Sequence, residues 1–149
     1  MRETQEEFTH RKVREFFALH DALWAALDFE QLATLWDAQD PHPTYIGDEY
    51  WAPVEGWSAL RQHLGRMEAR IDQARLQSTV RWTRCVSRDV IVAVVLQDWH
   101  FRGVEGPEMH SGSAWVTAIL RRSEAGLRMF HYMEASVYLP DEARDGLLG

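Results

Sequence analysis

The sequence predicts an α+β domain in which three N-terminal helices pack on a curved antiparallel sheet around an internal pocket. Three observations predict it. A length of 149 residues suits one domain. Apolar residues recur at helical spacing in the first half of the chain, and at a spacing of two in the second half. Helices that precede strands, rather than alternate with them, are typical of α+β folds. We therefore treat residues 1–149 as one domain.

The first half of the chain predicts three helices. The first is expected from about Glu6 to Leu27, because apolar residues and His20 fall on one helical stripe. Asp28, with Gln31 three residues later, has the spacing of a capping box and predicts a short second helix. Apolar residues spaced by three and four positions predict the third helix, which is expected to end near Arg75: Trp57, Leu60, Leu64, Met67 and Ile71. His63 borders the buried stripe that these residues form.

Residues 40–56, between the second and third helices, are expected to form an ordered, aromatic-rich loop. The segment holds three prolines and two glycines, which exclude a continuous helix. Only Thr44, Tyr45 and Ile46 read as a short strand within it.

The second half predicts four strands, at about residues 78–86, 90–102, 111–122 and 126–138. The linkers at residues 87–89 and 123–126 have hairpin length. We therefore expect the strands to pair in sequence order as an antiparallel meander.

Charge and composition exclude several functions. The formal net charge is −7 and Lys12 is the only lysine, so nucleic acids and anionic membranes are not expected partners. Cys85 is the only cysteine, and neither a signal peptide nor an apolar run of membrane-spanning length is visible. A cytoplasmic location is therefore expected.

The order of several short segments resembles the nuclear transport factor 2-like superfamily. These segments are Leu27-Asp28-Phe29, Leu35-Trp36-Asp37, Val54-Glu55-Gly56-Trp57 and the final hairpin. The superfamily includes SnoaL-like polyketide cyclases, ketosteroid isomerases, limonene epoxide hydrolase and the calmodulin-dependent kinase association domain. The last strand departs from the family pattern, with Leu127 in place of a tryptophan and residues 133–136 in place of the second histidine region. The resemblance implies a cone-shaped sheet around a pocket, and a homodimer.

Two catalytic candidates come from the resemblance to ketosteroid isomerases. His20 lies eight positions before Asp28, where the resemblance implies a side chain that donates a hydrogen bond to substrate. The alternative is that His20 is a core residue whose hydrogen bonds are all made within the protein. Asp48 is the carboxylate available where the resemblance places a general base. An exposed aspartate in a Gly47-Asp48 turn is the alternative.

Two further candidates lie on strands. Asp98 and His100 share one strand face, and Tyr132 and Glu134 share another. The resemblance to the kinase association domain favours the faces of His100 and Glu134 as inward, which would create an acid/base pair. A pair on the solvated outer face, or in a dimer interface, is the alternative.

Aromatic and polar side chains are expected to bind the substrate. Five of the seven tryptophans are expected to line a cavity for an aromatic or polycyclic molecule: Trp51, Trp57, Trp82, Trp99 and Trp115. About half of these should instead belong to the core or to a dimer surface. Tyr45 or Tyr132 is expected to orient a substrate oxygen. The expected substrate-binding residues are Tyr45, Trp51, Trp57, His63, Trp82, Asp98, Trp115 and Tyr132.

The sequence gives no indication of a metal, a nucleotide cofactor or a catalytic nucleophile. It has no helical histidine pair, no Cys/His cluster, no glycine-rich phosphate loop and no nucleophile elbow. We therefore expect no metal and no cofactor.

The leading functional hypothesis is a cofactor-independent lyase or isomerase that acts on a small aromatic molecule. One version eliminates water or an aldehyde from lignin-derived aromatic dimers. The alternative is a non-catalytic ligand-binding or oligomerisation domain. A third hypothesis, epoxide hydrolysis, requires Asp48, Arg84 and Asp98 to meet in the cavity.

Overall fold

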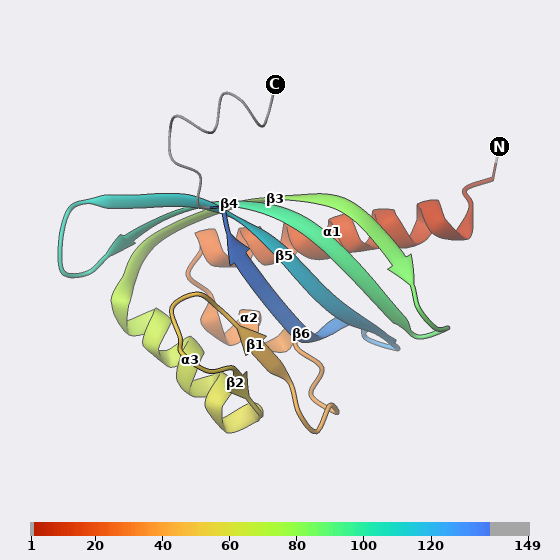
Figure 1. Ribbon diagram of the computed structural model, residues 1–149, viewed down its shortest axis with the longest axis horizontal. Coiled ribbons are helices and arrows are strands. Elements are labelled where there is room, and N and C mark those ends of the chain that lie inside the picture. Colours follow the sequence, from red (N-terminus) through yellow and green to blue (C-terminus); the bar gives the residue numbers. More distant parts are fainter. Residues whose placement is uncertain (1, 138–149) are drawn as a thin grey trace.

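The computed structural model describes residues 2–137 and confirms the predicted α+β class (Figure 1). Three helices, α1, α2 and α3, precede most of a six-stranded sheet. The helices span Gln5–Ala25, Phe29–Thr34 and Trp57–Arg70. Strands β1 to β6 span Thr44–Ile46, Val54–Glu55, Ile71–Cys85, Val90–Gly103, Met109–Ser123 and Gly126–Ser136.

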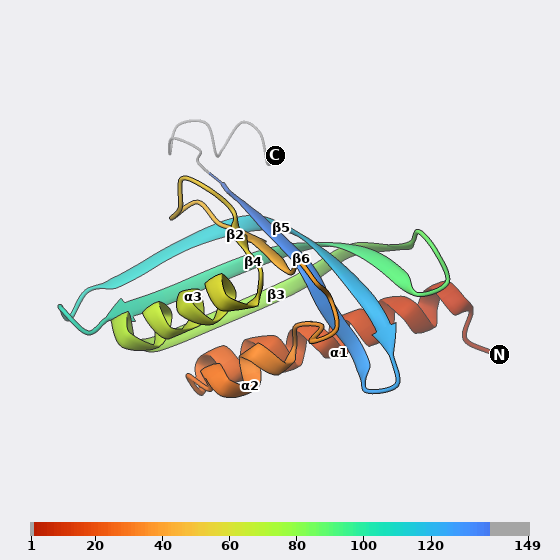
Figure 2. The ribbon, with the colours of Figure 1, turned by 90° about the horizontal axis from the view of Figure 1, so that it is seen from below.

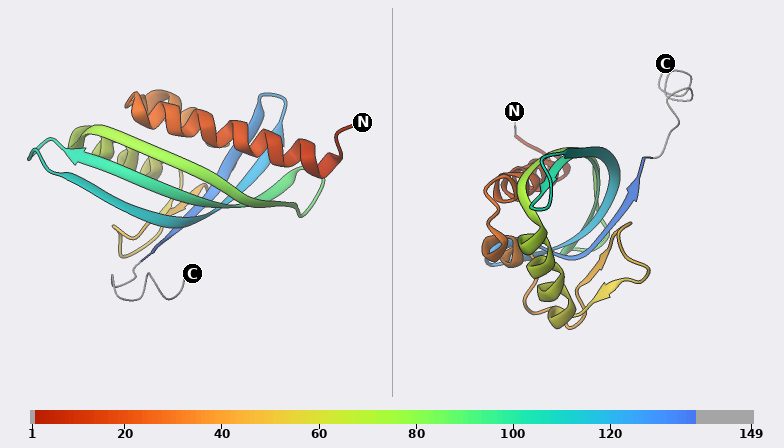
Figure 3. Two further views of the ribbon diagram at one scale, coloured as in Figure 1. Left: turned by 90° about the horizontal axis from the view of Figure 1, so that it is seen from above. Right: turned by 90° about the vertical axis from the view of Figure 1, so that its left-hand side faces the viewer.

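The sheet has the strand order β2-β1-β6-β5-β4-β3. Strands β3 to β6 pair in sequence order and antiparallel, which confirms the predicted meander. The short strand β1 pairs parallel to β6 and antiparallel to β2. Figures 2 and 3 show the sheet curving around the helices without closing on itself. The curved inner face is therefore the one that the helices cover.

Local sequence signals explain where the helices begin and end. Thr4 and Glu7 form a complete capping box at the start of α1. Leu27, with a φ of 53°, turns the chain after α1. The side chain of Asp28 then accepts a hydrogen bond from the backbone of Gln31 and so caps α2, as predicted.

The boundary between α3 and β3 differs from the prediction. The helix ends at Arg70, and Ile71 is already extended and pairs with Gly103. The apolar residue at 71 fitted the helical stripe, but it begins a strand that runs much longer than residues 78–86. The last strand ends at Ser136, and Tyr138, its predicted end, lies outside the described residues.

The apolar core lies between the inner face of the sheet and the helices. Its sheet side consists of side chains with no exposed surface: Ile91, Ala93, Val95, Val116, Ala118 and Leu120. Val13 and Phe17 of α1 and Leu60 of α3 pack in the same cluster. Full burial of one such side chain contributes about 1.5–3 kcal/mol. None of the helices within residues 2–137 combines the length and apolar composition needed to cross a membrane.

Candidate functional site

A cavity of about 330 Å³ opens beyond this core, at the end of the sheet where α3 and the β1–β2 loop lie. Its size is near the lower end of the range for small-molecule sites. Apolar and aromatic side chains from α1, α2, α3 and the sheet form most of its wall: Trp24, Leu32, Trp36, Leu60, Leu64, Met67, Ile71, Leu76, Trp99, Phe101 and Met129. The polar side chains at the wall are His20, Tyr45, Asp48, Glu49, His63, Gln97, Tyr132, Glu134 and Ser136.

Six residues singled out from the sequence meet at this cavity, although they come from five separate segments. They are His20, Tyr45, Asp48, His63, Tyr132 and Glu134. The parallel pairing of β1 with β6 places Tyr45 opposite Tyr132, so two segments almost ninety positions apart build one wall. The chemical roles of these residues remain predictions.

The predicted inward orientation of the His100 face of β4 is wrong. Gln97 is buried and lines the cavity together with Trp99, whereas His100 is exposed and hydrogen-bonded to Ser111 at 2.6 Å. Asp98 lies on the same outer face as His100 and accepts from Ser113. The physical reason is that α1 and α3 cover the face of β4 that carries Gln97 and Trp99, which leaves the face of His100 outward. The expected pair of His100 with Glu134 therefore does not form.

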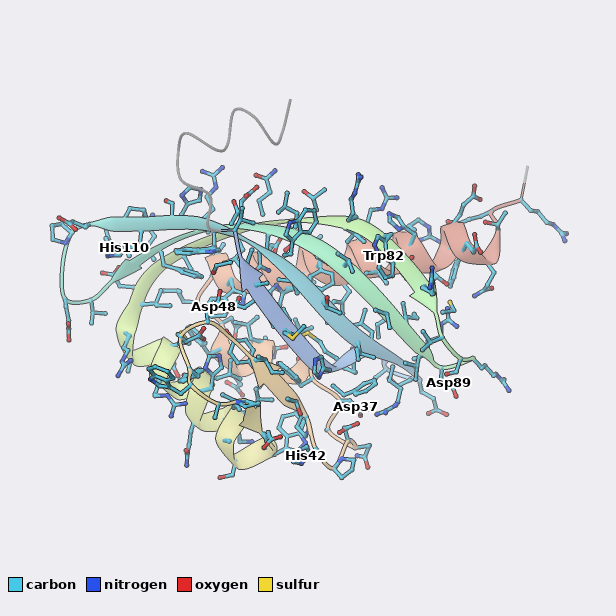
Figure 4. All side chains as sticks on the ribbon, viewed as in Figure 1. Asp37, His42, Asp48, Trp82, Asp89 and His110 are labelled. Carbon is cyan, nitrogen blue, oxygen red and sulfur yellow. The ribbon has the colours of Figure 1, made fainter. Side chains whose placement is uncertain are left out.

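The predicted tryptophan lining is also wrong for four residues. Trp51 is fully exposed, Trp82 and Trp115 are each 43% exposed, and Trp57 lies against Arg61 outside the cavity wall. Figure 4 shows Asp48 on the loop after β1 and Trp82 far from it, on the strand that runs beside α1. Trp99, the fifth tryptophan expected at the cavity, does line it, together with Trp24 and Trp36, which were not expected there. Trp24 had a sequence signal, because it lies one helical turn after His20.

Four nearly parallel rings form an aromatic column along one wall of the cavity. The ring of His63 stacks on Tyr45 with 4.3 Å between centroids, and Tyr45 stacks on Tyr132 at 5.5 Å. Tyr132 in turn stacks on His20 at 6.2 Å. The order along this column, His63, Tyr45, Tyr132 and His20, fixes which polar groups lie at each end of the wall.

A carboxyl group lies beside the middle of the aromatic column. The hydroxyl of Tyr45 lies 3.0 Å from Glu134 Oε1 and 2.7 Å from Glu49 Oε1. One hydroxyl has one proton, so it can donate to only one of the two carboxylates. Burial, and then repulsion from Glu49, raise the pKa of Glu134 to about 7. A protonated Glu134 can donate to Tyr45 while Tyr45 donates to Glu49, which satisfies all three groups.

Three rings of the column, those of His63, Tyr45 and Tyr132, are held in their neutral forms. Burial, with help from the charge of Glu134, raises the pKa of both Tyr45 and Tyr132 above the usual value for tyrosine. Burial lowers the pKa of His63 to about 4. At neutral pH the rings of His63, Tyr45 and Tyr132 are therefore uncharged, and the pKa of Glu134 beside them is near neutrality.

Asp48 lines the mouth of the cavity but is engaged by β6. Its carboxylate accepts hydrogen bonds from the backbone N–H of Ser136, at 2.9 Å, and from the Ser136 hydroxyl. The residue is exposed, as the turn interpretation expected. Its neighbour Glu49 was missed by sequence reasoning, because nothing in a loop sequence shows which of two adjacent carboxylates approaches Tyr45.

His20 is buried and bound on both sides. The indole N–H of Trp24 is only a donor and lies 3.3 Å from His20 Nε2. The Nε2 atom therefore carries the lone pair, and the proton on Nδ1 points to Asp21 Oδ1 at 3.4 Å. In this tautomer Nε2 accepts from Trp24 and the Nδ1 proton is directed to Asp21, so neither nitrogen has the donor role toward substrate that the resemblance implied.

The arrangement required for epoxide hydrolysis is not assembled. Arg84 is exposed, with its guanidinium 5.7 Å from the centre of the Trp82 ring on the outer face. Asp98 also lies on the outer face, away from Asp48 at the cavity mouth. Within residues 2–137, no three His, Cys, Asp or Glu side chains are grouped as metal ligands would be.

The fold and the cavity can be compared with known proteins. No protein-family model matches the sequence, and no curated protein matches it significantly. A nuclear transport factor 2-like superfamily protein from Salmonella enterica serovar Typhimurium is similar over 87% of this chain and 92% of its own, with 12% identity and a TM-score of 0.72.

Two further solved structures are similar at comparable levels. A candidate scytalone dehydratase from Novosphingobium aromaticivorans covers 88% of this chain and 85% of its own, with 11% identity and a TM-score of 0.73. A ketosteroid isomerase-like protein from Erwinia carotovora covers 91% of this chain and 100% of its own, with 9% identity and a TM-score of 0.74. These likenesses confirm the predicted fold: the chain adopts the nuclear transport factor 2-like architecture.

Proposed function

We propose that this protein is a cofactor-independent acid–base enzyme, a lyase or isomerase, that moves a proton on a small aromatic molecule bound in the cavity. The observation that supports this most strongly is Glu134. It is a carboxyl group in a largely apolar cavity, and its pKa of about 7 suits a group that accepts and returns a proton near neutral pH.

The neighbours of Glu134 fit this role. Tyr45 is hydrogen-bonded to its carboxyl and keeps its own proton, because burial raises the pKa of the phenol. The flat rings of Trp24, Trp36 and Trp99 would hold an aromatic substrate by offset or edge-on contacts. The carboxylate form of Glu134 would take a proton from a carbon atom next to a carbonyl group.

The returning proton distinguishes the two reaction types. In an isomerase, Glu134 gives the proton to a different carbon of the substrate. In a dehydrating lyase, it gives the proton to a departing hydroxyl group, which leaves as water. Two proteins of similar fold have names that refer to these reaction types: a candidate scytalone dehydratase and a ketosteroid isomerase-like protein. Elimination of an aldehyde from lignin-derived aromatic dimers is a narrower version of the same proposal.

Proton exchange tests the step that both reaction types share. β-Tetralone has acidic protons next to its carbonyl group, and their replacement by deuterium in D₂O can be followed by proton NMR. We expect the protein to accelerate this exchange, and Glu134→Gln to reduce the acceleration by about 10²- to 10⁴-fold. Glu68→Gln, on the exposed side of α3, is the matched control and should exchange at the rate of the unaltered protein.

Two outcomes would contradict the proposal. Exchange by Glu134→Gln at the unaltered rate would remove Glu134 from the chemistry. Binding of β-tetralone without any acceleration of exchange would favour the alternative, a non-catalytic ligand-binding domain.

A further inference from the structure

Two chains of hydrogen bonds run from charged groups behind the wall of the cavity to polar groups on its surface. One begins at the carboxylate of Asp21, on α1, and the other at the guanidinium of Arg66, on α3. A carboxylate only accepts hydrogen bonds and a guanidinium only donates them. Each charge therefore fixes the direction of the first hydrogen bond, and the donors and acceptors available to the next groups set the directions that follow.

The chain that begins at Asp21 leads to Tyr132. Asp21 accepts from the backbone N–H and from the hydroxyl of Ser78, both at 2.7 Å. Because the Ser78 proton is used there, its oxygen accepts from the side-chain amide of Gln97 at 3.3 Å. The amide oxygen of Gln97 then faces Tyr132 and accepts its hydroxyl proton at 2.9 Å. Tyr132 thus has only oxygen lone pairs left to offer a ligand.

Asp21 also fixes the direction of the hydrogen bonds of His20. The Nδ1–H of His20 points to Asp21, and Nε2 holds the lone pair that faces Trp24. The Nε2 lone pair of His20 is taken by Trp24 and its Nδ1 proton is directed to Asp21, so the acceptor presented at this end of the aromatic column is the hydroxyl oxygen of Tyr132. A ligand at this end is stabilised by a donor such as a hydroxyl group.

The chain that begins at Arg66 has the opposite direction. Arg66 Nε donates to the hydroxyl oxygen of Tyr50 at 3.1 Å, and Tyr50 lies 2.8 Å from His63 Nδ1. Arg66 can only donate, so among the described contacts of Tyr50 the acceptor for its hydroxyl proton is His63 Nδ1. His63 is neutral, since burial lowers its pKa to about 4, so its single proton is on Nε2. Among residues 2–137, the hydrogen bond to Tyr50 is the one that the His63 ring makes, and His63 lines the cavity.

We propose that the cavity selects an aromatic ligand with a hydroxyl group at one end and a carbonyl group at the other. The hydroxyl donates to Tyr132 and the carbonyl accepts from His63 Nε2–H. Asp21 and Arg66 are positioning residues that set this polarity without touching the ligand. The inference rests on the proposed function in one respect, because it takes the same cavity as the ligand site.

The order of the rings in the aromatic column determines which part of such a ligand lies beside Glu134. His63 and Tyr132 lie on either side of Tyr45, whose hydroxyl is bonded to Glu134. A ligand held at both ends therefore places the bonds between its carbonyl and its hydroxyl beside the carboxyl of Glu134. Where this part of the ligand holds a C–H group next to the carbonyl, the carbonyl acidifies that proton.

Three matched probes test the polarity by binding alone. para-Hydroxyacetophenone has both groups, para-methoxyacetophenone lacks the donor, and para-ethylphenol lacks the carbonyl. We expect the first to bind about tenfold more tightly than either of the others in an NMR titration of the ¹⁵N-labelled protein, because each analogue leaves a buried polar group unpaired. Equal binding of the three probes, or no binding of para-hydroxyacetophenone, would overturn the proposal. Either result can be obtained whether or not the protein has catalytic activity.

Two variants separate the two chains, and each is the control for the other. Asp21→Asn should remove the preference for the hydroxyl group and keep the preference for the carbonyl. Arg66→Met should do the reverse, because Tyr50 is then free to accept from His63. A variant that changes both preferences equally, or neither, would overturn the roles of Asp21 and Arg66.

The histidine tautomers give a readout that needs no variant. In ¹⁵N NMR spectra of the unaltered protein at neutral pH, long-range couplings show which ring nitrogen carries the proton. We expect the proton on Nε2 in His63 and on Nδ1 in His20. The opposite tautomer in either ring would reverse the polarity at that end and overturn the proposal.

Discussion

The two faces of the curved sheet carry similar residues but differ in what covers them. Along β4, the inner face begins with the apolar residues Ile91 and Val95 and continues with Gln97 and Trp99. The outer face of the same strand ends with the polar residue His100. Both faces therefore run from apolar residues to aromatic and polar ones. The helices remove water from the inner face only. Desolvation, rather than residue type, distinguishes a carboxyl group with a raised pKa, such as Glu134 with a pKa of about 7, from an exposed polar group such as His100.

The largest expected difference between the faces is in proton transfer. Glu134→Gln on the inner face should slow the exchange of β-tetralone protons by about 10²- to 10⁴-fold. His100→Gln on the outer face should change the rate by less than about twofold, because an exposed side chain away from the cavity makes no contact with the reacting atoms. Proton NMR in D₂O measures both. A large loss with His100→Gln would mean that the outer face takes part in the chemistry.

Stability should also distinguish the faces. Leu120, on the inner face of β5, has no exposed surface, whereas Leu96, on the outer face of β4, is partly exposed. Leu120→Ala should lower the free energy of unfolding by about 2–5 kcal/mol, because it leaves a cavity in the core. Leu96→Ala should cost about 1 kcal/mol or less. Urea unfolding checks the pair, and equal losses would contradict the burial described for the two faces.

The pH dependence of stability should show two opposite contributions from the cavity wall. The pKa of Glu134 is raised from 4.5 to about 7, so its contribution is fully present below pH 4.5 and is lost as the pH rises through 7. The pKa of His63 is lowered from 6.5 to about 4, so its contribution is present above pH 6.5 and is lost as the pH falls through 4. Each contribution is about 3 kcal/mol at most.

Single variants separate these contributions, which partly cancel in the unaltered protein. Relative to Glu134→Gln, the unaltered protein should lose stability as the pH rises from about 5 to about 8. Relative to His63→Gln, it should lose stability as the pH falls from about 6.5 to about 4. Urea unfolding at a series of pH values measures both differences. A difference that does not vary with pH would show that the residue does not titrate abnormally.

The smallest expected effects are those of the outer tryptophans. Trp115 is 43% exposed on β5, and Trp115→Ser should change the stability of the folded chain by about 0.5 kcal/mol or less. The homodimer implied by the family resemblance remains a prediction, and we expect it to use this face. Sedimentation should then show a dimer for the unaltered protein and a weaker dimer for Trp115→Ser. A dimer of unchanged strength would place the contact elsewhere.

Much of the fold could be predicted from the sequence, because periodicity and capping are local signals. The cap at Asp28 and the meander of the last four strands follow from such signals. The end of α3 could not be placed, since Ile71 suits the buried side of a helix and of a strand equally well. Its extended conformation depends on pairing with Gly103, which is distant in the sequence.

The site was less predictable because strand alternation does not show which face is covered. Choosing the face of His100 as inward placed Gln97 on the outer face, although Gln97 belongs to the cavity wall with Trp99. On β6, a bulge at Phe130 moves Met129 to the same inner side as Tyr132. Glu49 and Tyr45 meet Glu134 through tertiary contacts only, and no local pattern reports such contacts.

Direct titration of Glu134 tests the central claim, that desolvation in this cavity makes one carboxyl group an acid and a base at neutral pH. The protein is labelled with ¹³C at its glutamate carboxyl carbons, and their NMR signals are followed as the pH is varied. We expect one signal with a midpoint near 7 that is absent from Glu134→Gln. Midpoints below about 5 for every glutamate, as in solvent-exposed carboxyl groups, would contradict the claim.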